Sequence, residues 1–561
     1  MRDPETDKKT HFSLLSPDDD DSLFTLSDNT ENDLSVSFLA ESVSGNSTEY
    51  EIIRKILLNM PMSRRTIEYR SDICADLRSS PELCEELHEI FDAMRFYVND
   101  RPNTLDKNST IWELFMRLRA LDSYVGSVRR IIKAIDGHEF RSEGMKKFAA
   151  YMNDIYSDSG FDELAEDIAE VGDDISSIRS LTLGVNLDRD LFPEEVGILS
   201  LNRFWFGEQG LLKRFIKYHR KDQINDKKIM PFNMEVHEDG LDTIEKRINR
   251  NAPKHNRPYD SPLMNNLNSI IERMLPSVTG KLRKVLDRYV DVSLSAFTAL
   301  ADEFLFYLRF ISLEKELSDL GMPCCQGECS DKDTFMTDFY NIRLAICRLR
   351  GTVTDDIVCN DIEFTDDTAV QILTGPNRGG KTILTQGIGL AFLMYQSGLF
   401  VPAASAKIRP CDGIYTHFPA EEERTVALGR LGEEAERFRE ICRTAGRDSL
   451  ILFNESFATT SHTESLYIAE DVLKYLCCTG SRTCFNTHMH ELAENADAIS
   501  SVPGAVCRAV SVVMENRDGE RTYKISFKKP DGKSYAHEIA CKYGITFEQL
   551  INKQSADRKE E

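Results

Sequence analysis

The chain has 561 residues, of which 41% are hydrophobic and 29% are charged, a composition typical of a globular protein rather than a disordered or fibrous one. Its 93 acidic residues outnumber its 69 basic residues, and the formal net charge of −24 excludes a protein that coats nucleic acid along its whole length, though not one with a local basic groove. The fourteen cysteines, the polar N-terminus and the absence of an uninterrupted apolar stretch predict a cytoplasmic protein with reduced thiols and no membrane partner.

The composition of the first 48 residues predicts an acidic, disordered arm. Residues 1–50 contain twelve Asp or Glu against three Lys or Arg, and their apolar residues are isolated. A segment of this composition buries too little apolar surface to offset the entropy that is lost on ordering. The Leu14–Leu15 pair has two interpretations that stay open: it docks on a partner, or it is part of a solvated tail.

Residues 49–345 predict a helical region. Ser80 and Pro81 indicate the start of one helix, and apolar residues recur on one face after it, namely Leu83, Leu87, Ile90, Phe91 and Met94. Residues 281–320 contain neither Gly nor Pro, which predicts a single helix of about 60 Å. A helix of this length is typical of a coiled-coil arm or of a lever between distant sites.

Two segments interrupt the helical pattern. Residues 181–199 predict strands joined by a turn. Residues 213–228 form a basic window with seven Lys or Arg against two Asp, and its candidate contacts to DNA phosphates are Lys213, Arg214, Lys217, Arg220 and Lys221. The alternative interpretation of this basic window is a solvated, charged helix.

Residues 346–561 predict an α/β domain that ends in a helical tail. Short apolar strands are indicated at residues 369–374, 449–453 and 483–486. Apolar and polar residues alternate over 522–527 after the turn at 518–519, which predicts a hairpin. The alternation of strands and helices is typical of nucleotide-binding domains.

The most specific motif is a glycine-rich turn between the first of these strands and a helix. It matches G-x-x-x-x-G-K-T and consists of Gly375, Pro376, Asn377, Arg378, Gly379, Gly380, Lys381 and Thr382. The glycines let backbone N–H groups point at phosphate oxygens, Lys381 neutralises the β- and γ-phosphates, and the Thr382 hydroxyl is a ligand for Mg²⁺. The positive N-terminus of the following helix adds to the attraction. The motif therefore predicts that the chain binds ATP with Mg²⁺.

Polar residues follow the next two strands. Asn454 and Glu455 end a buried strand, where nucleotide hydrolases place one acid that holds Mg²⁺ and another that orients the attacking water. Asn454 replaces the first acid and brings no charge, whereas Glu455 keeps the water-orienting carboxylate. His488 follows the third strand at a position to reach the γ-phosphate. The alternative for His488 and His490 is a metal site.

In this order the motifs resemble those of the MutS family of DNA mismatch-repair ATPases. The resembling segments are TGPNRGGKT (374–382), GLFVPAASAKI (398–408), LILFNES (450–456), NTHMHEL (486–492) and GKSYAHEIACKYGI (532–545), with GVNLDRDL (184–191) as a looser landmark. The resemblance implies an α + α/β fold, in which a long-helix core, lever and clamp region is followed by a P-loop ATPase domain of ABC type.

The resemblance also implies residue roles and partners. Asn377, Gly380, Lys381 and Thr382 would bind ATP–Mg²⁺, and Asn454 would take the place of the metal-holding acid. Glu455 would support hydrolysis, His488 would be the switch histidine, and residues 456–463 would meet a partner subunit. Since the family works as dimers, a homodimer that clamps DNA and resets by slow ATP hydrolysis is implied.

Departures from the family pattern leave a second function open. No segment resembles the two α/β domains that precede the helical core in mismatch readers, and Gly429 stands near the place of a signature Ser. These departures, Asn454 and the net charge of −24 favour the alternative, which is a nucleotide-switched module that binds a protein or a ribonucleoprotein.

Overall fold

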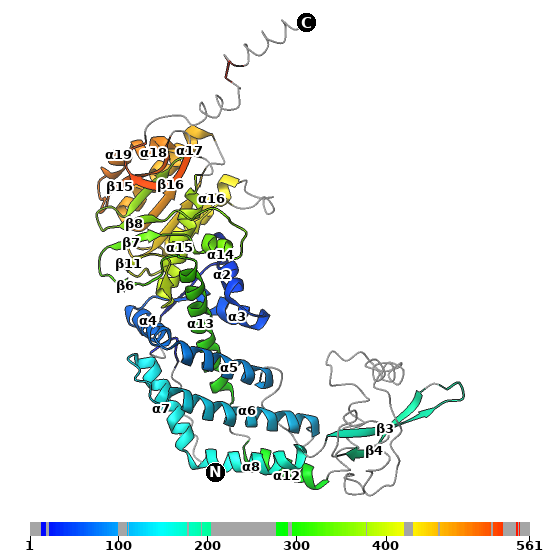
Figure 1. Ribbon diagram of the computed structural model, residues 1–561. Coiled ribbons are helices and arrows are strands. Elements are labelled where there is room, and N and C mark those ends of the chain that lie inside the picture. Colours follow the sequence, from blue (N-terminus) through cyan, green and yellow to red (C-terminus); the bar gives the residue numbers. More distant parts are fainter. Residues whose placement is uncertain are drawn as a thin grey trace. The chain divides into compact units, whose positions relative to one another are not determined.

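The computed structural model describes residues 13–17, 22–98, 109, 111–176, 179–191, 193–202, 276–289, 294–376, 379–419, 430–457, 461–517, 520–530, 546, 547 and 549. The chain forms two compact units, which are described separately (Figure 1). The sheet unit comprises residues 1–84, 139–147 and 302–561, and the helical unit comprises residues 85–138 and 148–301. This division differs from the boundaries expected after residues 48 and 345, because the chain enters and leaves the helical unit twice.

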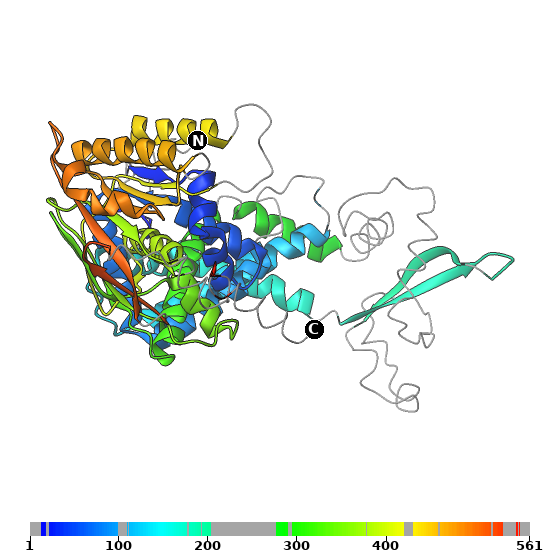
Figure 2. The ribbon, with the colours of Figure 1, turned by 90° about the horizontal axis from the view of Figure 1, so that it is seen from above.

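The helical unit consists of packed helices and one hairpin. Here α6 (Ile111–Ile135), α8 (Ser159–Ser176) and α12 (Pro276–Arg288) pack against one another (Figure 1). Three further helices run partly in this unit, namely α5 (Pro81–Val98), α7 (Glu143–Ser157) and α13 (Leu294–Asp319). Four of the five residues predicted on one face of α5 are confirmed as buried, namely Leu83, Leu87, Ile90 and Phe91, and the side chain of the fifth, Met94, lies outside the part that the structure describes. The strands predicted at 181–199 are also confirmed, as the antiparallel hairpin of β3 (Ser180–Leu187) and β4 (Pro193–Asn202) (Figure 2).

The single helix predicted over residues 281–320 is wrong, because two helices cover this range. α12 ends at Arg288 and α13 begins at Leu294. At the end of α12 the Tyr289 hydroxyl donates to Asp167 Oδ2 of α8 at 2.8 Å, and the Arg288 guanidinium bonds the same oxygen at 2.5 Å. These contacts hold the last turn of α12 on α8, so that tertiary packing overrides the uniform helical propensity of the sequence.

A six-stranded sheet organises the sheet unit. Its strand order is β12 (Ile414–His417), β13 (Leu450–Asn454), β14 (Arg482–Asn486), β9 (Val370–Thr374), β15 (Ala509–Arg517) and β16 (Glu520–Phe527). All neighbouring strands are parallel except the β15–β16 hairpin. Every residue of β9, β13 and β14 is buried, as expected for parallel strands that are covered on both faces. The three short strands and the hairpin that the sequence predicts are thereby confirmed.

Helices cover both faces of this sheet. On one face lies α15 (Lys381–Gln396), where a Cβ at Gly389 would stand 2.6 Å from the Leu34 side chain and 2.8 Å from that of Leu452 in β13. α17 (His462–Thr479), α18 (His490–Glu494) and α19 (Ala496–Ser500) cover the other face through a core whose strand residues include Ile372, Phe453 and Phe485. α16 (Arg430–Thr444) adds Ile441 to this core. The coarse expectation of a mixed helix-and-sheet fold is therefore confirmed.

Shorter elements complete the sheet unit. A four-stranded sheet has the order β6 (Glu328–Cys329), β11 (Ser405–Ile408), β7 (Thr334–Phe339) and β8 (Asn360–Phe364), and β5 (Cys325–Gln326) pairs with β10 (Phe400–Val401). Further helices of this unit are α3 (Ser47–Leu58), α4 (Arg64–Arg78) and α14 (Ile342–Leu349). Among the residues described, no helix is both long and apolar enough to cross a bilayer.

The predicted disorder of residues 1–48 is wrong where the structure describes this segment. β1 (Leu23–Thr25) pairs with β2 (Asn59–Pro61), and α1 (Asp28–Leu34) and α2 (Val36–Val43) follow, with Ser27 capping α1. The apolar residues are few, but the sheet unit buries the main ones, namely Leu14, Leu26, Leu34, Val36 and Leu39. Leu14 therefore docks on its own chain, where its carbonyl oxygen accepts from the Tyr307 hydroxyl at 2.6 Å.

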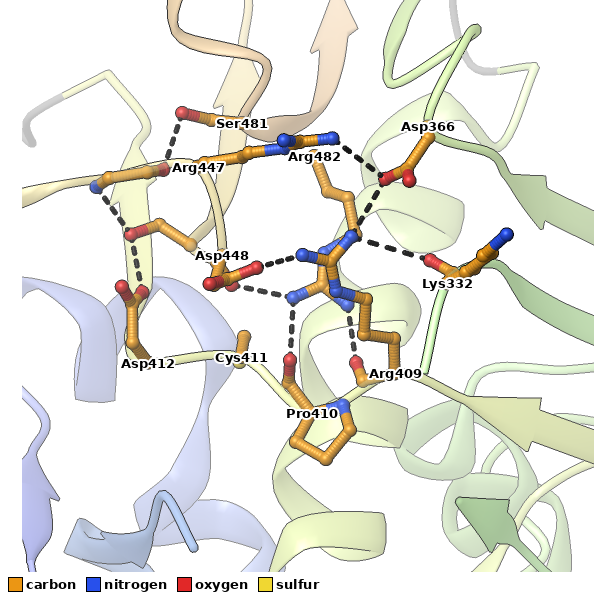
Figure 3. Close-up of polar contacts among 12 residues, drawn as sticks. Lys332, Asp366, Arg409, Pro410, Cys411, Asp412, Arg447, Asp448, Ser481 and Arg482 are labelled. Carbon is orange, nitrogen blue, oxygen red and sulfur yellow. Dashed lines mark hydrogen bonds and ion pairs between the residues drawn. The ribbon is translucent and has the colours of Figure 1, made fainter. Parts of the chain in front are cut away.

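A buried arginine fixes the edge of the sheet where the parallel strands begin (Figure 3). Arg482, the first residue of β14, is 4% exposed. Its guanidinium donates to the carbonyl oxygens of Pro410 at 2.8 Å and of Asp448 at 2.5 Å, and also to that of Arg409. Arg409 in turn forms ion pairs with Asp366 and Asp448. Arg482 thus joins the segments that precede β12 and β13 to the start of β14.

Replacing Arg482 with methionine is expected to lower the free energy of unfolding by about 3 kcal/mol, because three carbonyl oxygens lose their buried donor. Urea denaturation followed by circular dichroism measures the effect. Arg508→Met is the matched control, since Arg508 pairs with Asp367 at the surface, and it is expected to leave the unfolding midpoint unchanged. A midpoint for Arg482→Met equal to that of the parent chain would show that Arg482 does not stabilise this edge.

Candidate nucleotide site

The candidate site forms where the parallel strands β9, β13 and β14 end at one edge of the sheet. Cross-strand pairing places Asn454 opposite Asn486, and Asn486 opposite Leu373. The glycine-rich turn follows β9 directly, and Glu455 and His488 follow the other two strands. Ligands of parallel sheets bind outside the carboxyl ends of the strands, so the register alone brings the predicted residues to one place.

The glycines of the turn occupy backbone positions that exclude side chains. Gly375 has a φ of 146°, and a Cβ there would lie 2.5 Å from the Met514 Cβ. Gly380 has a φ of 93° directly before the first residue of α15. Only glycine adopts such a backbone without strain, and its missing side chain leaves the N-terminus of α15 open to an anion. Asn377 and Arg378 of the same motif lie outside the described residues.

Lys381 is buried inside this turn. It is 4% exposed, and its Nζ donates to the carbonyl oxygens of Gly375 at 3.2 Å and of Pro376 at 3.3 Å. Nζ also lies 3.4 Å from His488 Nδ1. Burial lowers the pKa of Lys381, and the Glu455 carboxylate opposes that shift. The Lys381 ammonium thus donates to two neutral carbonyl oxygens, and no carboxylate among the described residues is hydrogen-bonded to it. Its positive charge is therefore available to an incoming phosphate.

Three uncharged side chains join the ends of β13 and β14 to the turn. Asn454 Oδ1 accepts from the Thr382 hydroxyl at 2.8 Å and from Asn486 Nδ2 at 2.6 Å. Asn454 is 8% exposed and Asn486 is fully buried, and the Asn486 Oδ1 atom has no hydrogen-bond partner in the described structure. Asn486 was not predicted as a site residue, although its place at the end of a buried strand is the signal that could have identified it. A buried, unpaired acceptor on a side chain that is bonded to Asn454 fits a water ligand of Mg²⁺.

Glu455 and His488 face each other at the rim of the site. Glu455 Oε1 lies 2.6 Å from His488 Nε2, and the two side chains are 37% and 40% exposed. The hydrogen bond from His488 lowers the pKa of Glu455, so the carboxylate stays ionised at neutral pH. Its position is fixed by the backbone, because Glu455 N–H donates to the Asn486 carbonyl oxygen at 2.8 Å. His488 therefore touches both Glu455 and Lys381, one through each ring nitrogen.

A cavity of about 380 Å³ adjoins the turn on the side of α14. Gly379, Lys381, Thr382 and Glu455 line one end, and the rest is lined by residues from three other segments, among them Tyr340, Leu344, Asp355, Ile357, Val358, Met514 and Tyr523. An apolar cavity with a few polar groups at its edge is the usual form of a small-molecule site. The sequence did not predict these residues as a site, because no local motif links segments so far apart in the chain.

Several expected site residues lie outside the described residues. They include the candidate DNA contacts Lys213, Arg214, Lys217, Arg220 and Lys221, as well as Gly429, residues 458–460 and the motif at 532–545. In the part of the chain that the structure describes, no three or more His, Cys, Asp or Glu are grouped so that they could hold a metal ion. The described residues therefore do not support the alternative of a metal site built on His488 and His490.

Two family models match the chain. Residues 371–558 match MutS domain V, and residues 62–320 match the MutS2 N-terminal domain. The first match includes the glycine-rich turn, Asn454, Glu455, Asn486 and His488, and the second includes the whole of the helical unit.

Individual relatives match over shorter stretches. Endonuclease MutS2 of Staphylococcus epidermidis is 33% identical over 200 residues, which are 36% of this chain and 25% of the relative. Endonuclease MutS2 of Streptococcus equi subsp. equi is 32% identical over 214 residues, or 38% and 27%. DNA mismatch repair protein MutS of Leuconostoc mesenteroides subsp. mesenteroides is 30% identical over 255 residues, or 44% and 29%. The chain thus spans between a quarter and three tenths of the length of these relatives.

Proposed function

Because this chain belongs to the MutS family, we propose that it is an ATP-dependent DNA-binding protein that works as a homodimer, clamps DNA and resets by hydrolysing ATP. The observation that carries the proposal is the buried Lys381, which the glycine-rich turn holds within reach of His488, beside a rim that carries Glu455. Relatives named endonucleases match only over about a quarter of their length, so no nuclease activity is proposed for this chain.

The residues present fit ATP with Mg²⁺. The glycine positions would receive the phosphates and Lys381 would neutralise them, Thr382 and Asn454 would hold the metal with its water ligands, and the adjoining cavity would receive the nucleoside. Bound ATP–Mg²⁺ supplies the γ-phosphate and the cation that offsets its charge. Gly375, Pro376, Gly379 and Gly380 supply the cradle, together with Asn377 and Arg378 by their place in the motif.

Glu455 and His488 would carry the hydrolytic step. The ionised Glu455 carboxylate orients a water molecule, and His488 holds that carboxylate at 2.6 Å. Since His488 also lies 3.4 Å from Lys381, its ring responds to any movement of the ammonium toward a phosphate. This link would let the rim distinguish the ATP-bound from the ADP-bound state.

Asn454→Asp is expected to lower the Mg²⁺ concentration needed for half-maximal ATP turnover by about tenfold, because a carboxylate at this place adds a charge near the metal. The carboxylate fits, since Asn454 Oδ1 already acts only as an acceptor from Thr382 and Asn486. A magnesium titration of steady-state hydrolysis measures the shift. An unchanged magnesium dependence would mean that residue 454 does not hold the metal.

DNA binding is tested by filter binding with duplex, mismatched, branched and single-stranded DNA, each with and without ATP. We expect ATP to change the affinity, and binding to weaken by roughly 10³-fold between 50 and 200 mM salt if about six phosphates are contacted. Neutralising Lys213, Arg214 and Lys217 together should flatten this salt dependence. Neutralising Lys529 and Arg508, which pair at the surface with Asp497 and Asp367, should not. Binding of no DNA under any of these conditions would contradict the proposal.

A second candidate function keeps the ATPase but replaces DNA by a protein or a ribonucleoprotein. The net charge of −24 and the uncharged Asn454 favour it. A pull-down with the full chain, treated with nuclease, separates the two functions. Protein partners that stay bound after the treatment support the binding of a protein or ribonucleoprotein, whereas partners that are released support the binding of DNA.

A further inference from the structure

The loop after β13 holds two residues in a backbone conformation that side chains disfavour. Glu455 has a φ of 53° and Phe457 has a φ of 63°. A non-glycine residue in the left-handed region is strained, and it stays there only where the surrounding contacts determine its position. The contacts that hold Ser456 and Phe457 therefore also determine where the Glu455 carboxylate lies.

Ser456 is tied to the last residue of β12. Its Oγ lies 2.6 Å from the His417 carbonyl oxygen and 2.7 Å from His417 Nδ1. Ser456 and His417 are each 1% exposed. Because solvent is excluded, no water replaces these bonds when one partner is removed.

The other side of the His417 ring reaches α16. His417 Nε2 lies 2.9 Å from the Glu434 carbonyl oxygen, which only accepts, so Nε2 carries the proton and Nδ1 is an acceptor. The Ser456 hydroxyl has one proton, which it shares between Nδ1 and the His417 carbonyl oxygen. Burial lowers the pKa of His417 to about 4, and the ring is neutral at ordinary pH. The ring also stacks on Phe457 with centroids 5.1 Å apart, and Phe457 N–H donates to the Glu434 carboxylate at 2.7 Å. One imidazole thus braces both residues that follow Glu455.

We propose that His417 is a positioning residue for ATP hydrolysis, which holds Ser456 and Phe457 so that Glu455 keeps its water-orienting place and which ties this loop to α16. The inference rests on the proposed function, because it assigns Glu455 to the hydrolytic step. α16 is itself anchored on β12, since Arg437 donates to the Thr416 carbonyl oxygen at 3.0 Å and pairs with Asp33 of α1. His417 acts through its neighbours and not on the nucleotide.

The test compares His417→Phe, which keeps the stacked ring and removes both nitrogens, with Ser456→Ala and with the double variant. Each single change is expected to lower kcat for ATP by about tenfold through a small displacement of Glu455, and to leave the affinity for ATP–Mg²⁺ within about twofold. The double variant should lose less than the product of the single losses, because both single changes remove the contact between His417 Nδ1 and Ser456 Oγ. His417→Asn, which restores an acceptor toward Ser456, should recover most of the turnover.

Tyr475→Phe is the matched control. Tyr475 lies on α17, and its ring contacts that of Phe438 of α16 with centroids 6.3 Å apart, so the variant alters a side chain next to α16 and leaves His417 and Ser456 in place. It should leave kcat unchanged. A kcat for His417→Phe equal to that of the parent, or a double variant whose loss is the product of the single losses, would overturn the positioning role.

A second measurement does not depend on activity. Hydrogen exchange at the Phe457 amide should accelerate by at least about tenfold in His417→Phe, because the loop loses its brace. Unchanged exchange there would also overturn the inference. A parent chain that hydrolyses no ATP would contradict the proposed function instead, and the exchange measurement would still decide whether His417 holds the loop.

Discussion

Replacing Lys381 with alanine is expected to weaken the binding of ATP–Mg²⁺ by at least about 100-fold, or about 2.7 kcal/mol. The ammonium is almost fully buried, and its hydrogen bonds in the described structure go to two carbonyl oxygens of the turn and to His488. The substitution removes the positive charge and the donor at once, and no other Lys or Arg among the described residues lines the cavity beside the turn. Equilibrium titration with a fluorescent ATP analogue measures the loss.

Lys474→Ala is the control for this experiment. Lys474 lies on α17, where it pairs with Glu470 at 2.8 Å on the surface, so its removal changes the net charge by the same amount without touching the site. Its affinity for the analogue should equal that of the parent chain. If Lys381→Ala and Lys474→Ala bind equally well, the glycine-rich turn is not the phosphate site.

Glu455→Gln is expected to slow ATP hydrolysis by about 10²- to 10³-fold while ATP stays bound, because an amide cannot orient and deprotonate water as a carboxylate does. Because the hydrogen bond from His488 lowers the pKa of Glu455, the carboxylate of the parent chain stays ionised at pH values where an ordinary glutamate begins to take up a proton. Turnover should therefore not fall on the acid side until the pH drops below these values. Single-turnover phosphate release measures the rate, and a filter assay measures the retained nucleotide.

Glu491→Gln provides a matched carboxylate-to-amide change outside the site. Glu491 also pairs with a histidine, His462, at 3.0 Å, but on the surface of the sheet unit. Hydrolysis by Glu491→Gln should equal that of the parent. A Glu455→Gln variant that hydrolyses ATP at the parental rate would show that Glu455 does not take part in hydrolysis.

The sequence predicted those parts of the fold that local patterns encode. The strands β9, β13 and β14 are short, each contains an apolar run, and polar residues stand at or after their ends, and the structure buries all of their residues. The glycine-rich turn was recognised because its spacing is fixed by the backbone that it must form, with Gly375 and Gly380 at positive φ. Glu455 and His488 could be proposed from the sequence because each follows one of these strands.

Other features depend on contacts between distant segments. The acidic composition of residues 1–48 hid the buried Leu34, which packs beside Gly389 of α15. The break between α12 and α13 is accompanied by the bonds of Arg288 and Tyr289 to Asp167, which lies more than a hundred residues earlier in the chain. The pairing of Asn454 with Asn486 follows from strand register, which one sequence does not reveal.

The cavity next to the turn, and the contacts by which His417 holds the loop after Glu455, also depend on segments that are far apart in the chain. Tyr340, Ile357 and Tyr523 line one space although they come from different elements. His417 lies in a strand whose own pattern shows only that it is buried. Its partners, Glu434 and Ser456, are identified only when β12, α16 and the loop are in place.

Isothermal titration calorimetry of the full chain with ATP, in the presence and in the absence of Mg²⁺, decides whether the glycine-rich turn binds the nucleotide. We expect saturable binding with one ATP per chain that is tighter with Mg²⁺ and that is lost in Lys381→Ala. A folded chain that takes up no ATP at millimolar nucleotide with Mg²⁺ present would contradict this expectation.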